Sequence, residues 1–426
     1  MSDHAAERDD FATRARSATE ALRDLFPPTP LQENAHLSAR HGAKVLLKRE
    51  DLTPVRSYKI RGAWNAMRKA LARDPAHRLF VAASAGNHAQ GVAHACRHFA
   101  VRGVIFMPVT TPQQKIDKTR IFGGDAVEIR LVGDYFDDTL AAARKFCAEE
   151  GGHFLSPFDD EDVIEGQATV AVEILEQARG QFGVLPDVLV LPVGGGGLAS
   201  GVVEYLRREA PGIDVHFVEP AGGASFTAAL VAGRPVTLEK VDNFVDGAAV
   251  ARIGELTFAH LADTPLEKVH VAPEDRICAT MIEMLNVEGI VLEPAGALAV
   301  DALRDLEAEI AGRTVVCLTS GGNFDFERLP EVKERALRHT GLKKYYVLRM
   351  PQRPGALREF LDLLGPHDDI TRFEYLKKSA RNFGSVLIGI ETDDPANFPR
   401  LHARMDAAGL NYRDITDDEI LAEFLI

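Results

Sequence analysis

The clearest indication of the fold class is the stretch VLVLPVGGGGLASGVVEYLRREA, residues 188–210. In it, four consecutive glycines join an apolar run to a helical pattern. The run at 188–193 has the length and valine content of a buried parallel strand, and the segment after the glycines has apolar residues at helical spacing. A strand that leads through a tight turn into a helix is the repeating unit of α/β proteins. In open parallel sheets such a turn lies at the carboxyl edge, where ligands bind.

The helix that follows the turn is predicted to begin near Leu198, directly after Gly194, Gly195, Gly196 and Gly197. Each glycine costs roughly 0.5–1 kcal/mol relative to alanine, so four in a row need a reason. The free N–H groups at a helix start bind anions, and glycine lets a phosphate approach them closely. We therefore predict a phosphate-binding loop. A tight turn with close helix packing is the alternative, and it would explain one or two of the glycines.

The same alternation of strand and helix extends from residue 44 to about 330. Helical patterns such as SYKIRGAWNAMRKALARD lie between short apolar, β-branched runs, which predicts parallel sheets with helices on both faces and hence an α/β architecture. The predicted strands are 44–48, 80–84, 103–108, 126–132, 188–193, 215–219, 268–272 and 314–320.

Near residue 330 the pattern changes. LPEVKERALRHTGLKK is a charged helix and linker, and the segments after it predict a strand, a helix, two strands, a helix and a strand. This ferredoxin-like βαββαβ order makes a complete small domain, so we place a domain boundary between 330 and 344. The predicted segments are 344–350, 354–365, 370–378, 385–392, 395–409 and 411–416.

The composition is that of a soluble, enzyme-sized protein. The chain has 426 residues, of which 46% are hydrophobic and 26% charged, and this length suggests two or three units. The net charge of −14 argues against nucleic acid or an anionic membrane as a partner. The most apolar stretch, 188–203, is interrupted by Pro192 and the glycines, so we expect no membrane span.

The first residues and the cysteines point to the cytoplasm. MSDHAAERDDFATRARS lacks the apolar core of a secretory signal. The four cysteines are scattered without metal-ligand spacing, and Cys147 and Cys317 stand among apolar residues as small core residues do. Neither a disulfide nor a zinc site is favoured.

The kind of phosphate ligand follows from what the glycine stretch lacks. It has no GK[ST] as in a nucleotide P-loop, and it matches the dinucleotide fingerprint only by accident. Pyridoxal 5'-phosphate is the remaining common cofactor with a phosphate, and it requires a lysine for a Schiff base. In KREDLTPVRSYKIRGAW (48–64), Lys59 begins a helical pattern, and Gly62 and Ala63 leave room for a planar ring. A lysine at a helix start is most often a solvated charge, so Lys59 alone does not decide the question.

Two further segments place polar side chains at strand ends. SAGNHAQG (84–91) opens a helix after a strand, which makes a second anion-binding helix start. In it, Asn87 can both donate and accept hydrogen bonds, and His88 is either an acid–base group or a packing residue. LTSGGN (318–323) places the hydroxyl of Ser320 at a sheet edge.

KREDLTPVRSYKIRG, SAGNHAQG, PVGGGG and TSGGN follow one another in this order, and the combination resembles the threonine dehydratase (threonine deaminase) family. This family belongs to the tryptophan-synthase-β-like class of pyridoxal-phosphate enzymes, and the resemblance covers roughly residues 20–420. It implies a two-lobed parallel-sheet fold (fold type II) with a C-terminal ACT-like domain. The catalytic domain would cover 1–330 with a smaller lobe at about 55–160, followed by a linker at 331–343 and a regulatory domain at 344–426.

The resemblance also implies a role for each motif. Lys59 would hold the cofactor through a Schiff base and act as general base at the substrate Cα. Asn87 would bind the phenolic oxygen of the cofactor, and Ser320 would meet its pyridine nitrogen. The phosphate would be bound by Gly194, Gly195, Gly196, Gly197 and Leu198, and the substrate carboxylate by Ser84, Ala85, Gly86, Asn87 and His88. No metal is expected.

The activity that the resemblance implies is the deamination of L-threonine to 2-oxobutanoate and ammonia, the first step of isoleucine biosynthesis. Serine racemases of this class have a second serine where this chain has Ala85 and a second carboxylate near the equivalent of Glu219, so a racemase is less favoured. Cysteine synthases lack SAGNH. A serine-preferring or broad hydroxy-amino-acid ammonia-lyase remains an alternative, as does a non-catalytic amino-acid sensor.

The single C-terminal module implies allosteric control. In biosynthetic members of the family such a module would bind isoleucine as inhibitor, with valine opposing it. Modules of this kind pair their sheet edges across subunits, so we expect a homo-oligomer, either a dimer or a tetramer. A purely structural role in oligomerisation is the alternative.

Overall fold

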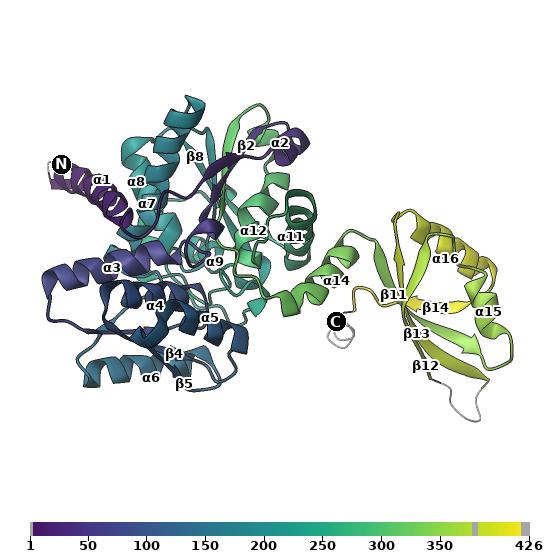
Figure 1. Ribbon diagram of the computed structural model, residues 1–426. Coiled ribbons are helices and arrows are strands. Elements are labelled where there is room, and N and C mark those ends of the chain that lie inside the picture. Colours follow the sequence, from purple (N-terminus) through teal and green to yellow (C-terminus); the bar gives the residue numbers. More distant parts are fainter. Residues whose placement is uncertain (1–2, 377–381, 419–426) are drawn as a thin grey trace. The chain divides into compact units, whose positions relative to one another are not determined.

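The computed structural model describes residues 3–376 and 382–418. The chain forms two compact units (Figure 1). The first comprises Met1–Glu274 and Val287–Asp325, and the second comprises Asp275–Asn286 and Phe326–Ile426. The first unit contains two separate sheets, one mainly and one wholly parallel, and the second contains one antiparallel sheet.

The larger sheet of the first unit has six strands in the order β1-β2-β10-β7-β8-β9. Five of them run parallel, and β1 pairs with β2 in the antiparallel direction. Every residue of β7 is buried, as its unbroken apolar sequence requires of a central parallel strand. The strands are β1 (Leu31–Glu33), β2 (Lys44–Arg49), β10 (Thr314–Thr319), β7 (Val188–Pro192), β8 (Asp214–Pro220) and β9 (Val269–Ala272).

The smaller sheet has four parallel strands in the order β5-β4-β3-β6, and apolar side chains are buried on both of its faces. Phe80 and Ala82 of β3 pack against the α3 and α4 side, while Val81 and Ala83 pack against α6. The strands are β5 (Val127–Leu131), β4 (Arg102–Met107), β3 (Leu79–Ala83) and β6 (His153–Phe154). The covering helices are α3 (Lys59–Arg73), α4 (Asn87–Phe99), α5 (Gln113–Gly123) and α6 (Phe136–Glu149).

Helices lie along the larger sheet (Figure 1). Their buried side chains form a large apolar core with those of the strands. Core residues come from α1, α7, α8, α9 and α10 and from the buried faces of the strands. The α/β architecture and all eight strands predicted between 44 and 320 are confirmed, whereas β1 and β6 were not predicted. The helices are α1 (Asp3–Leu22), α2 (Ala35–His41), α7 (Glu161–Gln177), α8 (Gly197–Glu209), α9 (Ser225–Ala232), α10 (Glu255–Leu261), α12 (Pro294–Asp301) and α13 (Glu307–Ile310).

The second unit contains the predicted βαββαβ order. Its antiparallel sheet has the order β12-β13-β11-β14, with α15 and α16 packed on one face. The strands are β11 (Lys343–Pro351), β12 (Asp368–Leu376), β13 (Phe383–Thr392) and β14 (Asn411–Asp414), and the helices of the unit are α11 (Glu274–Glu288), α14 (Leu329–His339), α15 (Ala356–Leu361) and α16 (Asn397–Ala407). Residues 377 and 378 of the predicted strand 370–378 lie outside the described residues.

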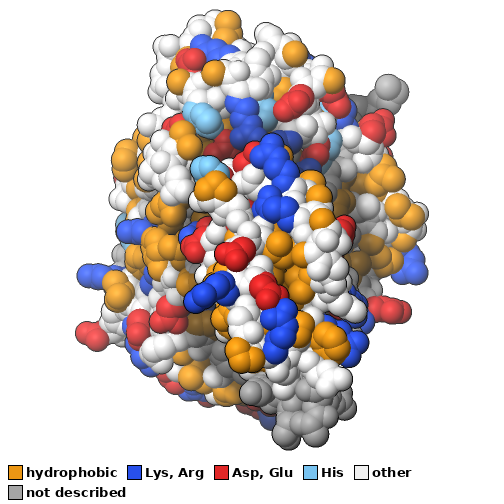
Figure 2. Space-filling model, turned by 90° about the vertical axis from the view of Figure 1, so that its right-hand side faces the viewer, with side chains coloured by type: hydrophobic (Ala, Val, Ile, Leu, Met, Phe, Trp, Pro, Cys, Tyr) orange, Lys and Arg blue, Asp and Glu red, His pale blue; other side chains and the backbone are white. Residues whose placement is uncertain are grey.

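The surface and the cysteines agree with the composition. On the face shown in Figure 2, acidic and basic side chains are interspersed. Within residues 3–376 and 382–418, no helix combines the length and apolar character needed to cross a membrane. All four cysteines are buried free thiols, so the prediction that Cys147 and Cys317 are core residues is confirmed.

Candidate active site

The sequence motifs meet at one edge of the larger sheet. The strands β2, β10 and β7 are parallel neighbours, so their carboxyl ends share an edge. The chain reaches Lys59 after β2, Ser320 after β10 and the glycines after β7. The backbone N–H of Tyr58 donates to the carbonyl of Ser320 at 3.1 Å. The start of α3 is thereby attached to the loop after β10.

Lys59 is the first residue of α3, and its side chain is half-buried. Its Nζ donates to the carbonyl of Pro157 at 2.9 Å and lies 5.3 Å and 5.9 Å from the ring centres of Tyr58 and Phe158. Burial lowers the pKa of Lys59 to about 8, although the charge of Glu293 acts in the opposite direction. Among the described residues, no carboxylate forms an ion pair with this amine, so a substantial fraction of it is neutral near physiological pH.

The four glycines pack against other parts of the protein. A Cβ on Gly195 would lie 2.2 Å from the ring of Phe158, and one on Gly197 would lie 3.0 Å from the same residue. On Gly194 it would meet the carbonyl oxygen of Ala248 at 2.8 Å. Gly196 has a φ of +90° and faces Thr257. Close packing therefore explains all four glycines. From the sequence, we expected it to explain only one or two of them.

The backbone N–H groups of the glycine loop offer several hydrogen-bond donors to an anion. Within the part of the chain that the structure describes, the N–H groups from Gly194 to Ala199 have no hydrogen-bond acceptor, and the first contact of the helix is from Ser200 to Gly196. They stand at the start of the 13-residue helix α8, whose dipole favours negative charge. The case for a phosphate thus rests on these donors and not on the number of glycines.

Gly62 and Ala63 do not provide space for a ring, so this prediction is wrong. A Cβ on Gly62 would lie 2.3 Å from the side chain of Gln167 in α7, and Ala63 lies in the core around α3 and α4. The small residue at 62 allows α3 and α7 to approach closely.

The loop after β3 brings Asn87 beside two residues to which the sequence analysis gave no role. Asn87 Nδ2 donates to Glu293 Oε1 at 2.6 Å, and Asn323 Nδ2 donates to Asn87 Oδ1 at 2.8 Å. In the same loop, the N–H of Gly86 donates to the hydroxyl of Ser84 at 3.2 Å, and Ala85 is half-buried. Asn323 belongs to the TSGGN motif, but nothing in the sequence pattern distinguishes Glu293.

His88 contacts a residue outside this group. Its Nε2 lies 3.1 Å from the carbonyl of Leu155, and the side chain is buried. Burial and the nearby charge of Lys59 lower the pKa of His88 to about 3. The imidazole is therefore neutral near pH 7, which favours the packing role among the two that the sequence left open.

Ser320 lies at the end of β10 with its hydroxyl buried. Its Oγ donates to the carbonyl of Ala295 at 3.2 Å. The next residue, Gly321, pairs with Ser57 in an isolated bridge. The hydroxyl is a neutral group near Lys59, with lone pairs that can accept and a rotatable proton.

Glu219 has a structural role. Its carboxylate accepts the N–H groups of Phe226 at 2.7 Å and Thr227 at 2.8 Å, and also the hydroxyl of Thr227 at 2.8 Å. Both carboxylate oxygens thus satisfy donors at the first turn of α9. Burial raises the pKa of Glu219 to about 7.

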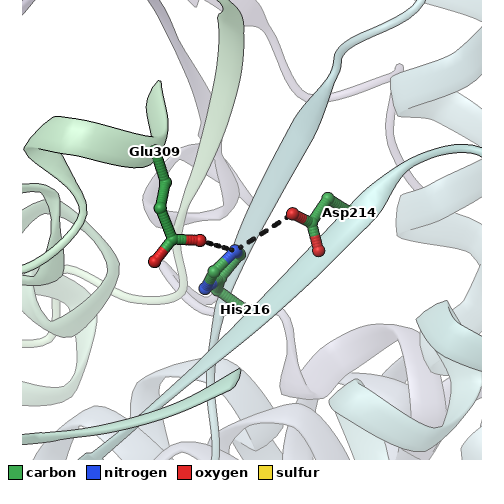
Figure 3. A group of neighbouring side chains, drawn as sticks. All are labelled: Asp214, His216 and Glu309. Carbon is green, nitrogen blue, oxygen red and sulfur yellow. Dashed lines mark hydrogen bonds and ion pairs between the residues drawn. The ribbon is translucent and has the colours of Figure 1, made fainter. Parts of the chain in front are cut away.

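Asp214, His216 and Glu309 offer three candidate metal-binding atoms within 4.8 Å of one another (Figure 3). The ammonium of Lys268 already lies among them, 2.9 Å from Asp214 and 3.6 Å from Glu309. A divalent ion at these atoms would be repelled by that ammonium. The group also lies at the amino end of β8, away from the edge where the motifs meet. We interpret it as an ion-pair cluster.

Comparisons with known proteins identify the family of the chain. Residues 22–321 match the family model described as "Pyridoxal-phosphate dependent enzyme", and residues 334–425 match "C-terminal regulatory domain of Threonine dehydratase". The biosynthetic L-threonine dehydratase IlvA of Bacillus subtilis (strain 168) is 47% identical over 410 residues, which are 96% of each chain.

Solved structures of threonine deaminases are also similar. The processed form of threonine deaminase isoform 2 from Solanum lycopersicum has 36% identity and a TM-score of 0.71, covering 78% of this chain and 88% of that one. The T.th. threonine deaminase has 33% identity and a TM-score of 0.68, covering 74% and 98%. The chain therefore belongs to the pyridoxal-phosphate-dependent enzymes, and within them to the threonine dehydratase family with a C-terminal regulatory domain.

Proposed function

We propose that the protein deaminates L-threonine to 2-oxobutanoate and ammonia, with loss of the β-hydroxyl, as the first step of isoleucine biosynthesis. The observation that carries this proposal is the desolvated amine of Lys59, placed where the loops after β2, β7 and β10 meet. The 47% identity to a biosynthetic L-threonine dehydratase supports threonine as the substrate.

The residues of the site fit pyridoxal 5'-phosphate. The N–H groups of Gly194, Gly195, Gly196, Gly197 and Leu198 offer a phosphate several donors at a helix start. Lys59 supplies the amine that the cofactor needs, Asn87 an N–H for the phenolic oxygen, and Ser320 a hydroxyl for the pyridine nitrogen. When bound, the cofactor supplies an electron sink for negative charge at the substrate Cα.

Lys59 is the proposed general base. Its lowered pKa leaves a neutral amine available near pH 8, and the contact with the Pro157 carbonyl limits the movement of Nζ. A tethered base within reach of the Cα proton gains from proximity as well as from basicity.

The loop Ser84, Ala85, Gly86, Asn87 and His88 is the proposed carboxylate site. It stands at the start of α4, where N–H groups and the helix dipole favour an anion. Because His88 is neutral and contacts Leu155, its contribution would come from the backbone N–H and not from the ring.

The regulatory proposal concerns the C-terminal domain. We propose a catalytic domain at 1–330 with a smaller lobe at about 55–160, a linker at 331–343 and an ACT-like domain at 344–426. The family match at 334–425 supports regulation through this domain, for which isoleucine is the proposed inhibitor and valine its opponent. We also propose a cytoplasmic homo-oligomer, a dimer or a tetramer.

The experiment that tests this function compares kcat/KM for threonine and serine, with and without isoleucine. We expect threonine to be preferred, isoleucine to lower the rate and valine to restore it. A preference for serine would indicate the broader ammonia-lyase, and an unchanged rate with isoleucine would leave the C-terminal domain a structural role. A protein that shows no visible chromophore after addition of the cofactor would contradict the proposal and indicate a sensor.

The lowered pKa of Lys59 predicts the pH dependence of cofactor uptake. Only the neutral amine attacks the cofactor aldehyde, so reloading of the apoprotein should speed up with pH to about 8 and level off above it. Below that value we expect about a tenfold loss of rate per pH unit. The visible absorption band measures the uptake. The rate of Nα-acetyl-lysine under the same conditions, divided by its neutral fraction, corrects for titration of the cofactor. A corrected rate that still rises above pH 9.5, as an amine with the ordinary pKa of 10.5 requires, would contradict the assignment.

A further inference from the structure

The side-chain amide of Asn87 is held from both ends. Its Nδ2 donates to Glu293 Oε1 at 2.6 Å, and its Oδ1 accepts from Asn323 Nδ2 at 2.8 Å. Glu293 is 206 residues away in the chain and Asn323 is 236, so the fold alone brings them together. Both bonds are at the short end of the range for N–H···O contacts, and the one to Glu293 involves an ionisable acceptor.

The two neighbours allow only one orientation of the Asn87 amide. Asn323 Nδ2 also donates to the carbonyl of Val55 at 2.7 Å, and because a carbonyl can only accept, the nitrogen of Asn323 must face Val55 and Asn87. A rotated Asn87 amide would then present N–H groups to an N–H donor and its oxygen to a carboxylate. Both hydrogen bonds would be lost at once.

This orientation leaves one donor of Asn87 available. An amide nitrogen carries two protons, and one of the two on Nδ2 is used by Glu293. Among the residues that the structure describes, the other has no acceptor. The phenolic oxygen of the cofactor needs such a donor, whereas a rotated amide would present an acceptor to it.

Glu293 is placed for this contact by the backbone around it. Its N–H donates to the carbonyl of Gly321 at 3.2 Å, and it directly precedes α12. A Cβ on Gly321 would lie 2.1 Å from Glu293 Oε1, so the first glycine of the TSGGN motif leaves the space that the carboxyl occupies. Burial and the charge of Asp246 raise the pKa of Glu293 to about 7, while the Asn87 hydrogen bond and the charges of Lys115 and Lys118 in α5 act in the opposite direction. Glu293 also interacts with the charge of Lys59.

We propose that Glu293 and Asn323 are positioning residues that fix the Asn87 amide with an N–H directed toward the phenolic oxygen of the cofactor. The proposal rests on the proposed function, because it assumes that Asn87 meets this oxygen. Glu293 and Asn323 act through Asn87 and not on the substrate. Loss of either one would allow the amide to rotate and would destabilise the deprotonated phenolic oxygen.

The test compares Glu293→Ala with Glu219→Ala in the cofactor-loaded protein without substrate, because a glutamine at 293 would keep an oxygen that accepts from Asn87. Glu219 is the matched control, because it is also buried with a pKa raised to about 7 but caps α9. For Glu293→Ala we expect the pH at which the visible band is half-converted to rise by about one unit and the cofactor dissociation constant to rise about tenfold. For Glu219→Ala we expect a lower melting temperature and an unchanged midpoint of that pH titration.

A second variant and a double variant separate positioning from general damage. Asn323→Ala frees the same amide from its other end and should shift the midpoint in the same direction. This variant keeps the test decisive if Glu293→Ala does not fold. In an Asn87→Ala background, Glu293→Ala should cause no further shift, because its effect passes through that amide. A shift that persists there, or equal behaviour of Glu293→Ala and Glu219→Ala, would overturn the proposal. A wild-type protein without the visible band would instead overturn the proposed function.

Discussion

Replacement of Lys59 by alanine should abolish threonine deamination and remove the visible absorption band of the bound cofactor. We expect kcat to fall at least about 10⁴-fold, because the variant lacks both the tether and the base that act at the substrate Cα. The fold should survive, since alanine suits the first turn of α3 and the lost contact is one hydrogen bond to the Pro157 carbonyl. The measurements are the absorption spectrum, the rate of 2-oxobutanoate formation and a thermal melt.

Lys145→Ala is the control for the loss of a lysine. Lys145 is exposed on α6 and pairs only loosely with Glu149 at 3.9 Å, so we expect normal activity and a normal spectrum. A Lys59→Ala protein that retained the band and more than a few per cent of the wild-type kcat would show that another amine holds the cofactor. Loss of folding in the melt would be the sign of a structural role for Lys59.

Much of the fold could be predicted because its strands are continuous, buried and apolar. The limits of β7 and β4 were predicted to within one residue, since each is bounded by glycine, proline or charge. The strands β1 and β6 have only three and two residues, too few for an alternating pattern, and they exist because β2 and β3 offer them unpaired edges. No local signal distinguishes such segments from loop.

The active site could be predicted only as far as its motifs are local. Lys59, Asn87 and Ser320 stand in short recognisable segments, but Glu293 contacts Asn87 across 206 residues. The glycines illustrate a different limit. Their number indicated a close approach, but the structure shows that Phe158 and Thr257 are among the groups that approach, which no spacing rule reveals.

Arg61 is the clearest case of a charge that the sequence could not place. It lies in the first turn of α3, two residues after Lys59, and is completely buried. Its Nε lies 2.7 Å from Glu50, and its Nη2 lies 2.8 Å from Glu173, which also binds the buried Lys48 at 2.6 Å. The network links α3 to β2 and α7. It thereby holds the helix start that carries Lys59.

Arg61→Met should lower the free energy of unfolding by about 3–5 kcal/mol, because it leaves Glu50 and Glu173 buried with too few positive partners. Arg102→Met is the control. Its pair with Glu128 is largely exposed, so its loss should cost no more than about 1 kcal/mol. Urea denaturation of both variants measures the difference. Equal losses would show that burial of the Arg61 network does not increase its contribution to stability.

The pH dependence of this loss tests whether Glu173 contributes to it. Burial alone would raise the pKa of Glu173, but the charges of Arg61 and Lys48 together outweigh burial and hold that pKa far below its ordinary value. A carboxyl with a depressed folded pKa stabilises the protein fully above the unfolded value of about 4.3, and this stability is lost as the pH falls below it. In Arg61→Met we expect the pKa of Glu173 in the folded state to rise. Glu173 then contributes less to the free energy of unfolding above about pH 4.3, and acid removes less of it. The difference between wild type and variant should therefore be constant from pH 6 to 8 and narrow below about pH 4, whereas a difference caused by lost packing alone would not change with pH.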